Sequence, residues 1–144
     1  MARRIKLEGA KELDRVLRRL PKKLGKRILT NASAAGGRVV SKEAKALVPV
    51  NTGDLRDSII VRRDPRRPGL VIVGPKYPQG AHGHLVEFGT AQGAVPHPFL
   101  RPAFDLKRVQ ALAKIGDSLG RAVERAAVKL AGSFAKSGVA SRRR

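Results

Sequence analysis

Four of the five aromatic residues of this chain lie between residues 77 and 104, and this clustering limits where a large core can form. Much of the other apolar content is alanine, so the rest of the core must be built from small side chains. Aromatic side chains bury the largest apolar areas in cores and interfaces. The stretch HLVEFGTAQGAVPHPFLRPAF, residues 84–104, is therefore predicted to be the centre of the fold or a contact between subunits.

Net charge is the second constraint. The 144 residues include 31 Lys and Arg against 11 Asp and Glu, which gives a formal net charge of +20. Such an excess attracts polyanions, so nucleic acid or an acidic protein surface is the expected neighbour, although a basic surface can also serve solubility alone. The absence of cysteine excludes a disulfide framework and a thiol nucleophile, and it fits a reducing cytoplasm.

The length predicts a single domain, which we place at residues 1–135, followed by a basic and flexible tail at residues 136–144. The first residues, MARRIKLEGAKELDRV, lack the apolar segment of a signal peptide. No run approaches the roughly 20 apolar residues of a membrane span. We therefore expect a soluble protein.

Residues 5–20 are predicted to form an amphipathic helix. Its apolar side chains recur at spacings of three and four residues, and they are Leu13, Val16, Leu17 and Leu20. Lysines and arginines, among them Lys11, fall on the other side. Pro21 interrupts this pattern because it lacks an amide hydrogen, and it is expected to open a second helix.

The second helix is predicted to run to about Leu47. The small residues Ala32, Ala35 and Gly36 permit another backbone to approach closely, and the Gly36–Gly37 pair allows a bend. From Pro102, which suits the first position of a helix, the rhythm of three and four returns and predicts a third long helix to about Leu130.

Two apolar, β-branched runs, 59–61 and 70–74, lie between the long helices. Because they are continuous rather than alternating, they predict a hairpin of strands that is covered on both faces. Arg66 and Arg67 in the connecting loop must point to water or to a partner. The segment HLVEF is predicted to make one or two helical turns that end at Gly89.

A metal site is one possible chemistry. His82, His84 and Glu87 could supply three ligands, but the two histidines converge only if the stretch is extended, and loop histidines with a structural glutamate are the simpler interpretation. Ser58 follows Asp57 but lies in no nucleophile-elbow pattern, and no phosphate-binding glycine motif is present. The sequence therefore predicts no enzyme, no cofactor and no metal.

A sequence-nonspecific nucleic-acid-binding protein is the main alternative function. The basic residues are spread over the helices and the tail, which fits contact with the phosphate backbone without base readout. Phenylalanines beside Leu and Pro, however, are more typical of a core or an interface than of a base-stacking platform. The candidate contacts with DNA or with an acidic partner are Arg66, Arg67, Arg142, Arg143 and Arg144.

Three motif blocks stand in order: PVNTGDLRDSI at 49–59, HLVEFGT at 84–90 and HPFLRPAF at 97–104. This combination resembles the phage tail-component family, the neck, head–tail joining or tail-completion proteins of long-tailed phages related to lambda. The matching residues are Pro49, Thr52, Gly53, Leu55, Arg56, Ser58 and Ile59, then Glu87, Phe88, Gly89 and Thr90, and finally Pro98, Phe99, Leu100, Arg101, Pro102 and Ala103.

The resemblance implies an α+β fold in which a small antiparallel β-sheet packs against long N-terminal and C-terminal helices. It also implies a structural virion protein of the neck or tail that is assembled in the bacterial host cytoplasm. A homo-oligomeric ring around the DNA channel is expected, with six copies or alternatively twelve. Its partners would be head-closure or adaptor proteins on one side and tail-terminator or tail-tube proteins on the other, with nonspecific contact to the genomic DNA.

The blocks suggest specific interactions. Thr52–Gly53 is expected to form a tight turn, because threonine can bond a nearby amide and glycine permits a positive φ. Glu87 lies between apolar neighbours and needs a partner, for which Arg101 or Arg56 is the candidate.

Phe99 and Leu100 lie between two prolines that hold the chain extended. We expect this pair to fill a pocket on a neighbouring subunit, as interface hot spots do, or to fill the core of its own subunit.

Overall fold

The computed structural model describes residues 22–140 of the chain. The predicted helix at 5–20, Pro21 and the arginines at 142–144 lie outside the described residues. The elements in chain order are α2 (Lys22–Leu47), α3 (Asp54–Ser58), β1 (Ile59–Arg63), β2 (Val71–Pro75), α4 (Gly83–Phe88) and α5 (Leu100–Ala140). Long helices combined with a small antiparallel sheet confirm the expected α+β class.

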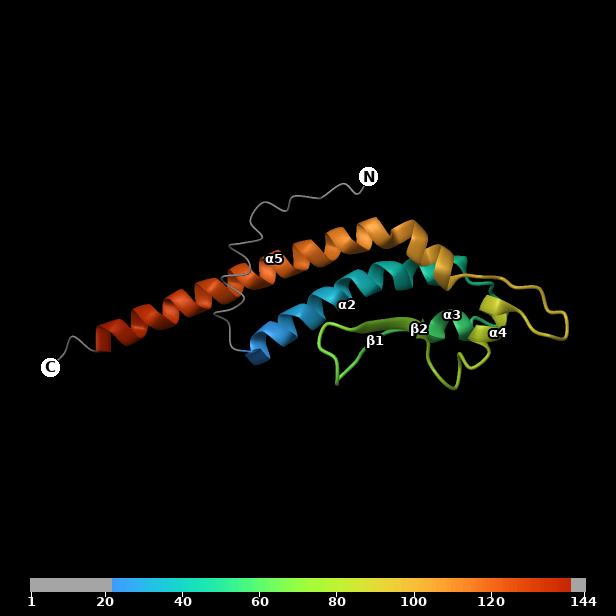
Figure 1. Cartoon of the computed structure of the whole chain (residues 1–144), viewed down its shortest axis with the longest axis horizontal. Coiled ribbons are helices and arrows are strands. Elements are labelled where there is room, and N and C mark those ends of the chain that lie inside the picture. The colour runs from blue at the N-terminus through green and yellow to red at the C-terminus, as the bar shows by residue number, and fades with distance from the viewer. Residues whose placement is uncertain (1–21, 141–144) are drawn as a thin grey trace, which may run out of the picture.

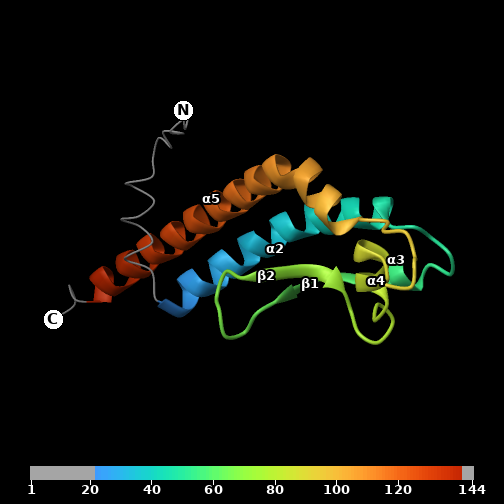
Figure 2. The ribbon, with the colours of Figure 1, turned by 45° about the vertical axis from the view of Figure 1, so that its right-hand side comes forward.

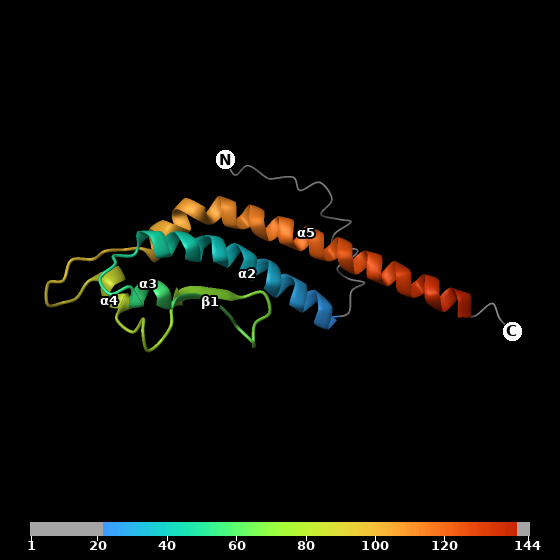
Figure 3. The ribbon, with the colours of Figure 1, turned by 180° about the vertical axis from the view of Figure 1, so that it is seen from behind.

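Helix α2 is the middle layer of the molecule. Helix α5 runs antiparallel to it on one side, and the two-stranded sheet lies on the other side (Figure 1). The view from behind shows the same order of layers, with α3 and α4 gathered beside the end of α2 (Figure 3). Each of the other layers is therefore held in place mainly by its contact with α2.

Two adjacent glycines let α2 be packed from two directions at once. A Cβ on Gly36 would lie 2.5 Å from Ile115 Cγ1 and 2.9 Å from the carbonyl oxygen of Ala111, both on α5. A Cβ on Gly37 would lie 3.0 Å from Val61 Cγ1 of β1. The close approach predicted for Gly36 is confirmed, and α2 continues through both glycines as one helix.

The hairpin is antiparallel, with Val61 opposite Val73 and Arg62 opposite Ile72. Val61 and Val73 lie against Gly37, so this face is covered by α2. The opposite face carries Ile72, which is 44% exposed. The prediction that both faces are covered is therefore wrong, because within residues 22–140 the helices cover the sheet on the α2 side and leave Ile72 exposed on the other.

The core is centred on Phe99 and Ile59, which are the fully buried large side chains among those the structure describes. Small residues of the two long helices surround them. The remaining buried members of this cluster are Val40, Ala44, Val48, Leu55, Ala103 and Ala111. A second, smaller cluster joins the start of α2 to the middle of α5 and contains Ile28, Val123 and Ala126.

The bounds of α5 differ from the prediction at both ends. The helix begins at Leu100, two residues before the predicted first position, Pro102. It also continues to Ala140, so residues 136–140 are helical where a flexible tail was predicted. Proline is tolerated anywhere in the first turn, where its missing N–H has no helical acceptor, so Pro102 alone could not fix the start.

Within residues 22–140, the helices are too polar or too short to serve as membrane spans.

We predict opposite effects from alanine at two helical glycines. Gly36→Ala should lower the free energy of unfolding by about 1–2 kcal/mol, because overpacking against α5 exceeds the gain in helix propensity. Gly116→Ala should raise it by about 1 kcal/mol, since no described atom lies within 4 Å of its Cβ position. Urea denaturation of both variants measures this difference, and equal effects would contradict the packing of α2 on α5.

Candidate assembly site around Glu87

A single carboxylate joins the second and third motif blocks. Glu87 lies in α4 and is only 6% exposed. Its Oε2 atom accepts hydrogen bonds from the backbone N–H groups of Phe99 at 2.8 Å and Leu100 at 2.9 Å. Its Oε1 atom accepts a third from the N–H of Arg101 at 3.2 Å. The side chain therefore caps the N-terminus of α5 from a different helix.

This cap completes the hydrogen bonds of the first turn of α5. The first N–H groups of a helix have no acceptor within the helix, and leaving them buried and unpaired is costly. Glu87 accepts those of Phe99, Leu100 and Arg101, and Pro102 has none to offer. The N–H of Ala103 returns to the carbonyl of Phe99 at 3.2 Å. The proline thus fits a turn whose other donors are all satisfied.

The surroundings of Glu87 stabilise its charged form. Burial by itself would raise the pKa of this carboxyl, but the N–H groups of Leu100, Phe99 and Arg101 together outweigh it, and the pKa is lowered. The positive charge of Arg101 acts in the same direction. The partial positive charge of a helix N-terminus favours an anion at this position as well.

The predicted side-chain ion pair of Glu87 is wrong. Among the described residues Glu87 forms no salt bridge with Arg101 or Arg56, and its three partners are backbone amides. Arg56 instead pairs with Asp57, with 3.0 Å between Nε and Oδ1. The sequence indicated correctly that Glu87 needs a partner, but backbone donors carry no residue-specific signal that could have identified them.

The loop between α4 and α5 is fixed at both ends. Gly89, with φ at +74°, ends α4 as predicted, and its N–H donates to the carbonyl of Leu85. Thr90 closes a short turn by accepting the N–H of Ala94 on its hydroxyl oxygen at 3.2 Å. The N–H of His97 donates to the carbonyl of Val86 at 2.8 Å. These contacts fix the path of the loop, so that the third motif block lies next to Glu87.

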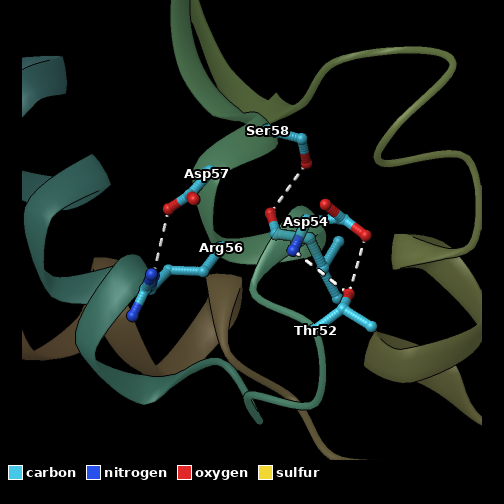
Figure 4. A network of polar contacts seen from close by, with 6 residues as sticks. Thr52, Asp54, Arg56, Asp57 and Ser58 are labelled. Atoms are coloured by element: carbon cyan, nitrogen blue, oxygen red, sulfur yellow. Dashed lines mark hydrogen bonds and ion pairs between the residues drawn. The ribbon is translucent and has the colours of Figure 1, made fainter.

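The first block forms the tight turn that its sequence predicts. Gly53 has φ at +93° and is the N-cap residue just before α3. The hydroxyl of Thr52 donates to Asp54 Oδ2 at 2.7 Å and its oxygen receives the N–H of Asp54 at 3.4 Å (Figure 4). At the other end of α3, the buried hydroxyl of Ser58 donates to the carbonyl of Leu55 at 2.7 Å.

The three blocks meet in space. Leu55 from the first block is buried in the same cluster as Phe99 from the third, and Leu100 packs against that cluster. A Cβ on Gly83, at the start of α4, would lie 3.1 Å from Leu55 Cδ1, so α3 and α4 are in close contact. The residues of the three motif blocks are therefore connected to one another, and they hold α3, α4 and the start of α5 together.

Phe99 is 0% exposed and fills the core of its own subunit, which was one of the two roles expected for it. The other role, in which its side chain fills a pocket on a neighbouring subunit, is wrong. The other aromatic side chains whose burial the structure describes are exposed. Phe88 is 73% exposed, Tyr77 is 78% exposed and Phe104 is 55% exposed. Of these three, only Phe88 belonged to the predicted site residues. Its position after the buried Glu87 turns it to the other side of the short helix.

The histidines do not assemble with Glu87. His82 and His84 are both exposed, and both oxygens of Glu87 face the amides of α5. In the part of the chain that the structure describes, no three His, Asp or Glu side chains are grouped closely enough to hold a metal ion.

Arg66 and Arg67, in the loop of the hairpin, differ in the contacts that their side chains make. The N–H groups of Arg66 and Arg67 donate to Asp64 Oδ1, and the guanidinium of Arg67 pairs with Asp64 Oδ2 at 2.9 Å. The N–H of Arg66, followed by the Arg67 side chain, lowers the pKa of Asp64. Both side chains are exposed, and the ion pair with Asp64 ties that of Arg67 to its own loop.

A basic groove, which sequence reasoning missed, lies between the start of α2 and the hairpin tip. It has a volume of about 440 Å³. Its cationic lining residues are Lys23, Lys26, Arg27 and Arg63. A hydrogen bond from the N–H of Gly69 to the hydroxyl of Thr30 at 3.0 Å fixes the tip against α2. Only the folding of the hairpin onto α2 brings Arg63 to the other three cations.

We predict that Glu87→Gln lowers the free energy of unfolding by about 2–3 kcal/mol at pH 7, because charged acceptors form the stronger hydrogen bonds. The folded pKa lies below the unfolded value of about 4.3. The carboxylate therefore contributes fully above that pH and loses its contribution as the pH falls through the folded pKa. Denaturation of both proteins across pH 3–7 should show the difference shrink at the acidic end.

Glu43→Gln is the matched control for this prediction. Glu43 pairs with Lys107 at 3.5 Å in a partly exposed position, and such pairs contribute about 0–1 kcal/mol. If the two variants lose the same stability, or if the effect of Glu87→Gln does not change with pH, the carboxylate does not cap α5 as described.

Comparison with known proteins gives one family. Residues 11–89 match the family model described as "Bacteriophage HK97-gp10, putative tail-component", which is more than half of the chain and includes the first motif block and the second up to Gly89. The third block lies beyond the matched residues. No curated protein and no solved structure matches the chain. The extent of the family match confirms the resemblance seen in the motifs, and the chain belongs to the HK97 gp10-like family of phage tail components.

Proposed function

We propose that this protein is a structural subunit of a homo-oligomeric ring in the neck or tail of a phage virion, around the channel for the genome. The family supports a tail component, and hence a location in the virion in contact with other virion proteins. Ring closure, the neck position and the DNA channel go beyond the family description. A hexamer is the proposed state, with a dodecamer as the alternative.

The observation that carries the proposal is the exposure of large aromatic side chains. Phe88, Tyr77 and Phe104 are 73%, 78% and 55% exposed in a chain with only five aromatic residues. Val95, in the loop after α4, is 71% exposed. Large apolar side chains that are exposed on a subunit are candidates for contacts between proteins, where aromatics that become buried are the usual anchors.

The site supports assembly better than chemistry. Glu87, the buried carboxylate of the site, is fully engaged by backbone amides and its pKa is lowered, so it is not poised to exchange a proton near neutral pH. The motif residues brace α3, α4 and the start of α5 against one another. We infer a structural role without catalysis, assembled in the host cytoplasm beside adaptor or head-closure proteins and tail-terminator or tail-tube proteins.

The basic groove gives the positive charge a specific location. Lys23, Lys26, Arg27 and Arg63 line it, and the carboxylate of Asp64, which also lines it, is already bound within its own loop. Such a cluster suits the phosphates of the genome or an acidic face of an adjoining ring. A sequence-nonspecific DNA-binding protein, the alternative function, would use the same groove without needing a ring.

We predict that the Phe88→Ala variant no longer assembles into a ring, while the fold of each subunit stays intact. The side chain is mostly exposed, so its removal should change the melting temperature little. Phe99→Ala is the matched control and should lower the free energy of unfolding by about 3–5 kcal/mol, because Phe99 fills the core. Light scattering after size exclusion, without DNA, measures the mass. A wild-type monomer, or an unchanged ring in Phe88→Ala, would contradict the proposed interface.

We predict that Lys26→Ala weakens binding to duplex DNA equally for all sequences and lowers the slope of log affinity against log salt by about 1. Lys42→Ala removes the same charge from an exposed position further along α2, outside the groove, and should leave the slope nearly unchanged. Equal effects of the two variants would show that charge alone, and not this groove, governs the binding. Tight DNA binding by a monomer would favour the alternative function.

A further inference from the structure

The outer side of α5 carries large apolar side chains that no other described part of the chain covers. α5 packs on α2 with its inner side, and no described helix or strand lies beyond it in the turned view (Figure 2). Leu106 is 65% exposed, Val109 is 76% exposed and Ala113 is exposed as well. Their spacing of three and four residues places them on one side of the helix. An exposed apolar strip of this kind is typical of a helix that pairs with another helix.

A line of four charged side chains lies next to this apolar strip. Lys114, Asp117, Arg121 and Glu124 are all exposed, and their spacing of three and four residues places them on one side of α5. Their signs alternate and cancel, in a chain whose net charge is +20. The ion pairs that the described residues form with one another include none of the four. Arg121 Nε donates to the main-chain carbonyl of Asp117 at 3.3 Å and not to its carboxylate.

The order of these charges is self-complementary about residue 119. Lys114 lies five residues before this point and Glu124 lies five residues after it. Asp117 and Arg121 lie two residues before it and two residues after it. If a second α5 runs antiparallel to the first with the two residues 119 side by side, each cation of the line meets a carboxylate of the other copy.

We propose that two copies of this chain pair antiparallel through the outer side of α5, outside the ring. The pair has two-fold symmetry, so the same surface is used on both copies and the line of charges forms four ion pairs. In a ring, all copies face the same way and meet through two different surfaces. The contact is therefore separate from the ring contact, and the inference does not depend on the ring.

Charge favours a second copy over other partners. A nucleic acid or a strongly acidic protein would meet the carboxylates of Asp117 and Glu124 beside the apolar strip, and a basic protein would meet Lys114 and Arg121. The alternating line is matched by its own sequence in reverse. Two copies of so basic a chain repel each other, and this line is a place where the charges cancel.

The absence of cysteine allows a direct test with the full-length protein. At a rise of about 1.5 Å per residue, Gly120 lies about 3 Å along the helix axis from its copy in the proposed pair. No described atom lies within 4 Å of its Cβ position, so a side chain has room there. Under mild oxidation, Gly120→Cys should therefore form a covalent dimer, which mass spectrometry identifies.

Val109→Cys is the matched control, because Val109 is exposed on the same strip but lies about 30 Å from its own copy in the antiparallel pair. It should cross-link about tenfold more slowly, since a disulfide needs Cα atoms within about 7 Å of each other. Equal rates for the two variants would indicate a parallel pair or random collision and would overturn the proposal.

A second test reverses charges in the Phe88→Ala variant, where the ring contact does not add to the mass. Sedimentation equilibrium of this variant should show a dimer of the 15.5 kDa chain. Asp117→Arg and Arg121→Asp should each weaken the dimer about tenfold, because two symmetry-related ion pairs become repulsive. The double variant, Asp117→Arg with Arg121→Asp, restores both pairs and should recover the affinity.

The two single reversals also separate pairing from net charge. Arg121→Asp lowers the charge of a basic chain, so it would strengthen an association that is limited by general repulsion, whereas Asp117→Arg would weaken it. Opposite effects of the two reversals, or a monomer in the Phe88→Ala variant, would overturn the proposal. A ring that persists in Phe88→Ala would contradict the proposed ring interface alone, and the Gly120→Cys cross-link would then decide whether the pair exists.

Discussion

The carboxylate of Glu87 is the interaction on which the rest of the structure depends. It accepts three backbone N–H groups at the start of α5, and by doing so it fixes where that helix begins and which way it points. A buried carboxylate with three amide donors is stabilised by hydrogen bonds and by the helix dipole, without a cationic side chain. The joint between α4 and α5 is therefore determined by backbone geometry.

This joint places one aromatic inside the subunit and leaves others outside. Because Phe99 donates its N–H to Glu87, its side chain enters the core beside Ile59 and Leu55. Phe88 follows Glu87 in sequence and points away from the amides, where it stays exposed. The same short stretch thus builds the core and presents an apolar surface, which is an economical arrangement for a chain with few aromatic residues.

The sequence predicted most of the helices, strands and turns, but few of the tertiary contacts between them. The end of α2 at Leu47, the turn at Thr52–Gly53 and the end of α4 at Gly89 were correct, because each depends on a local signal, either a proline just beyond the helix or a glycine with positive φ. The partners of Glu87 and the burial of Phe99 could not be predicted from the sequence. The partners are backbone N–H groups, which every residue except proline carries, and tertiary packing does not follow from residue type alone. The basic groove was missed for the same reason, because its cations come from distant elements.

The most direct measurement is the amide proton NMR of Phe99, Leu100 and Arg101 as a function of pH. If Glu87 caps α5, these three N–H groups exchange slowly with solvent, and their chemical shifts change together at a single pH below the ordinary range for glutamate, about 4.3. Amides that exchange at the rates of an open chain, or that show no common titration, would contradict the cap and with it the account of how the motif blocks are joined.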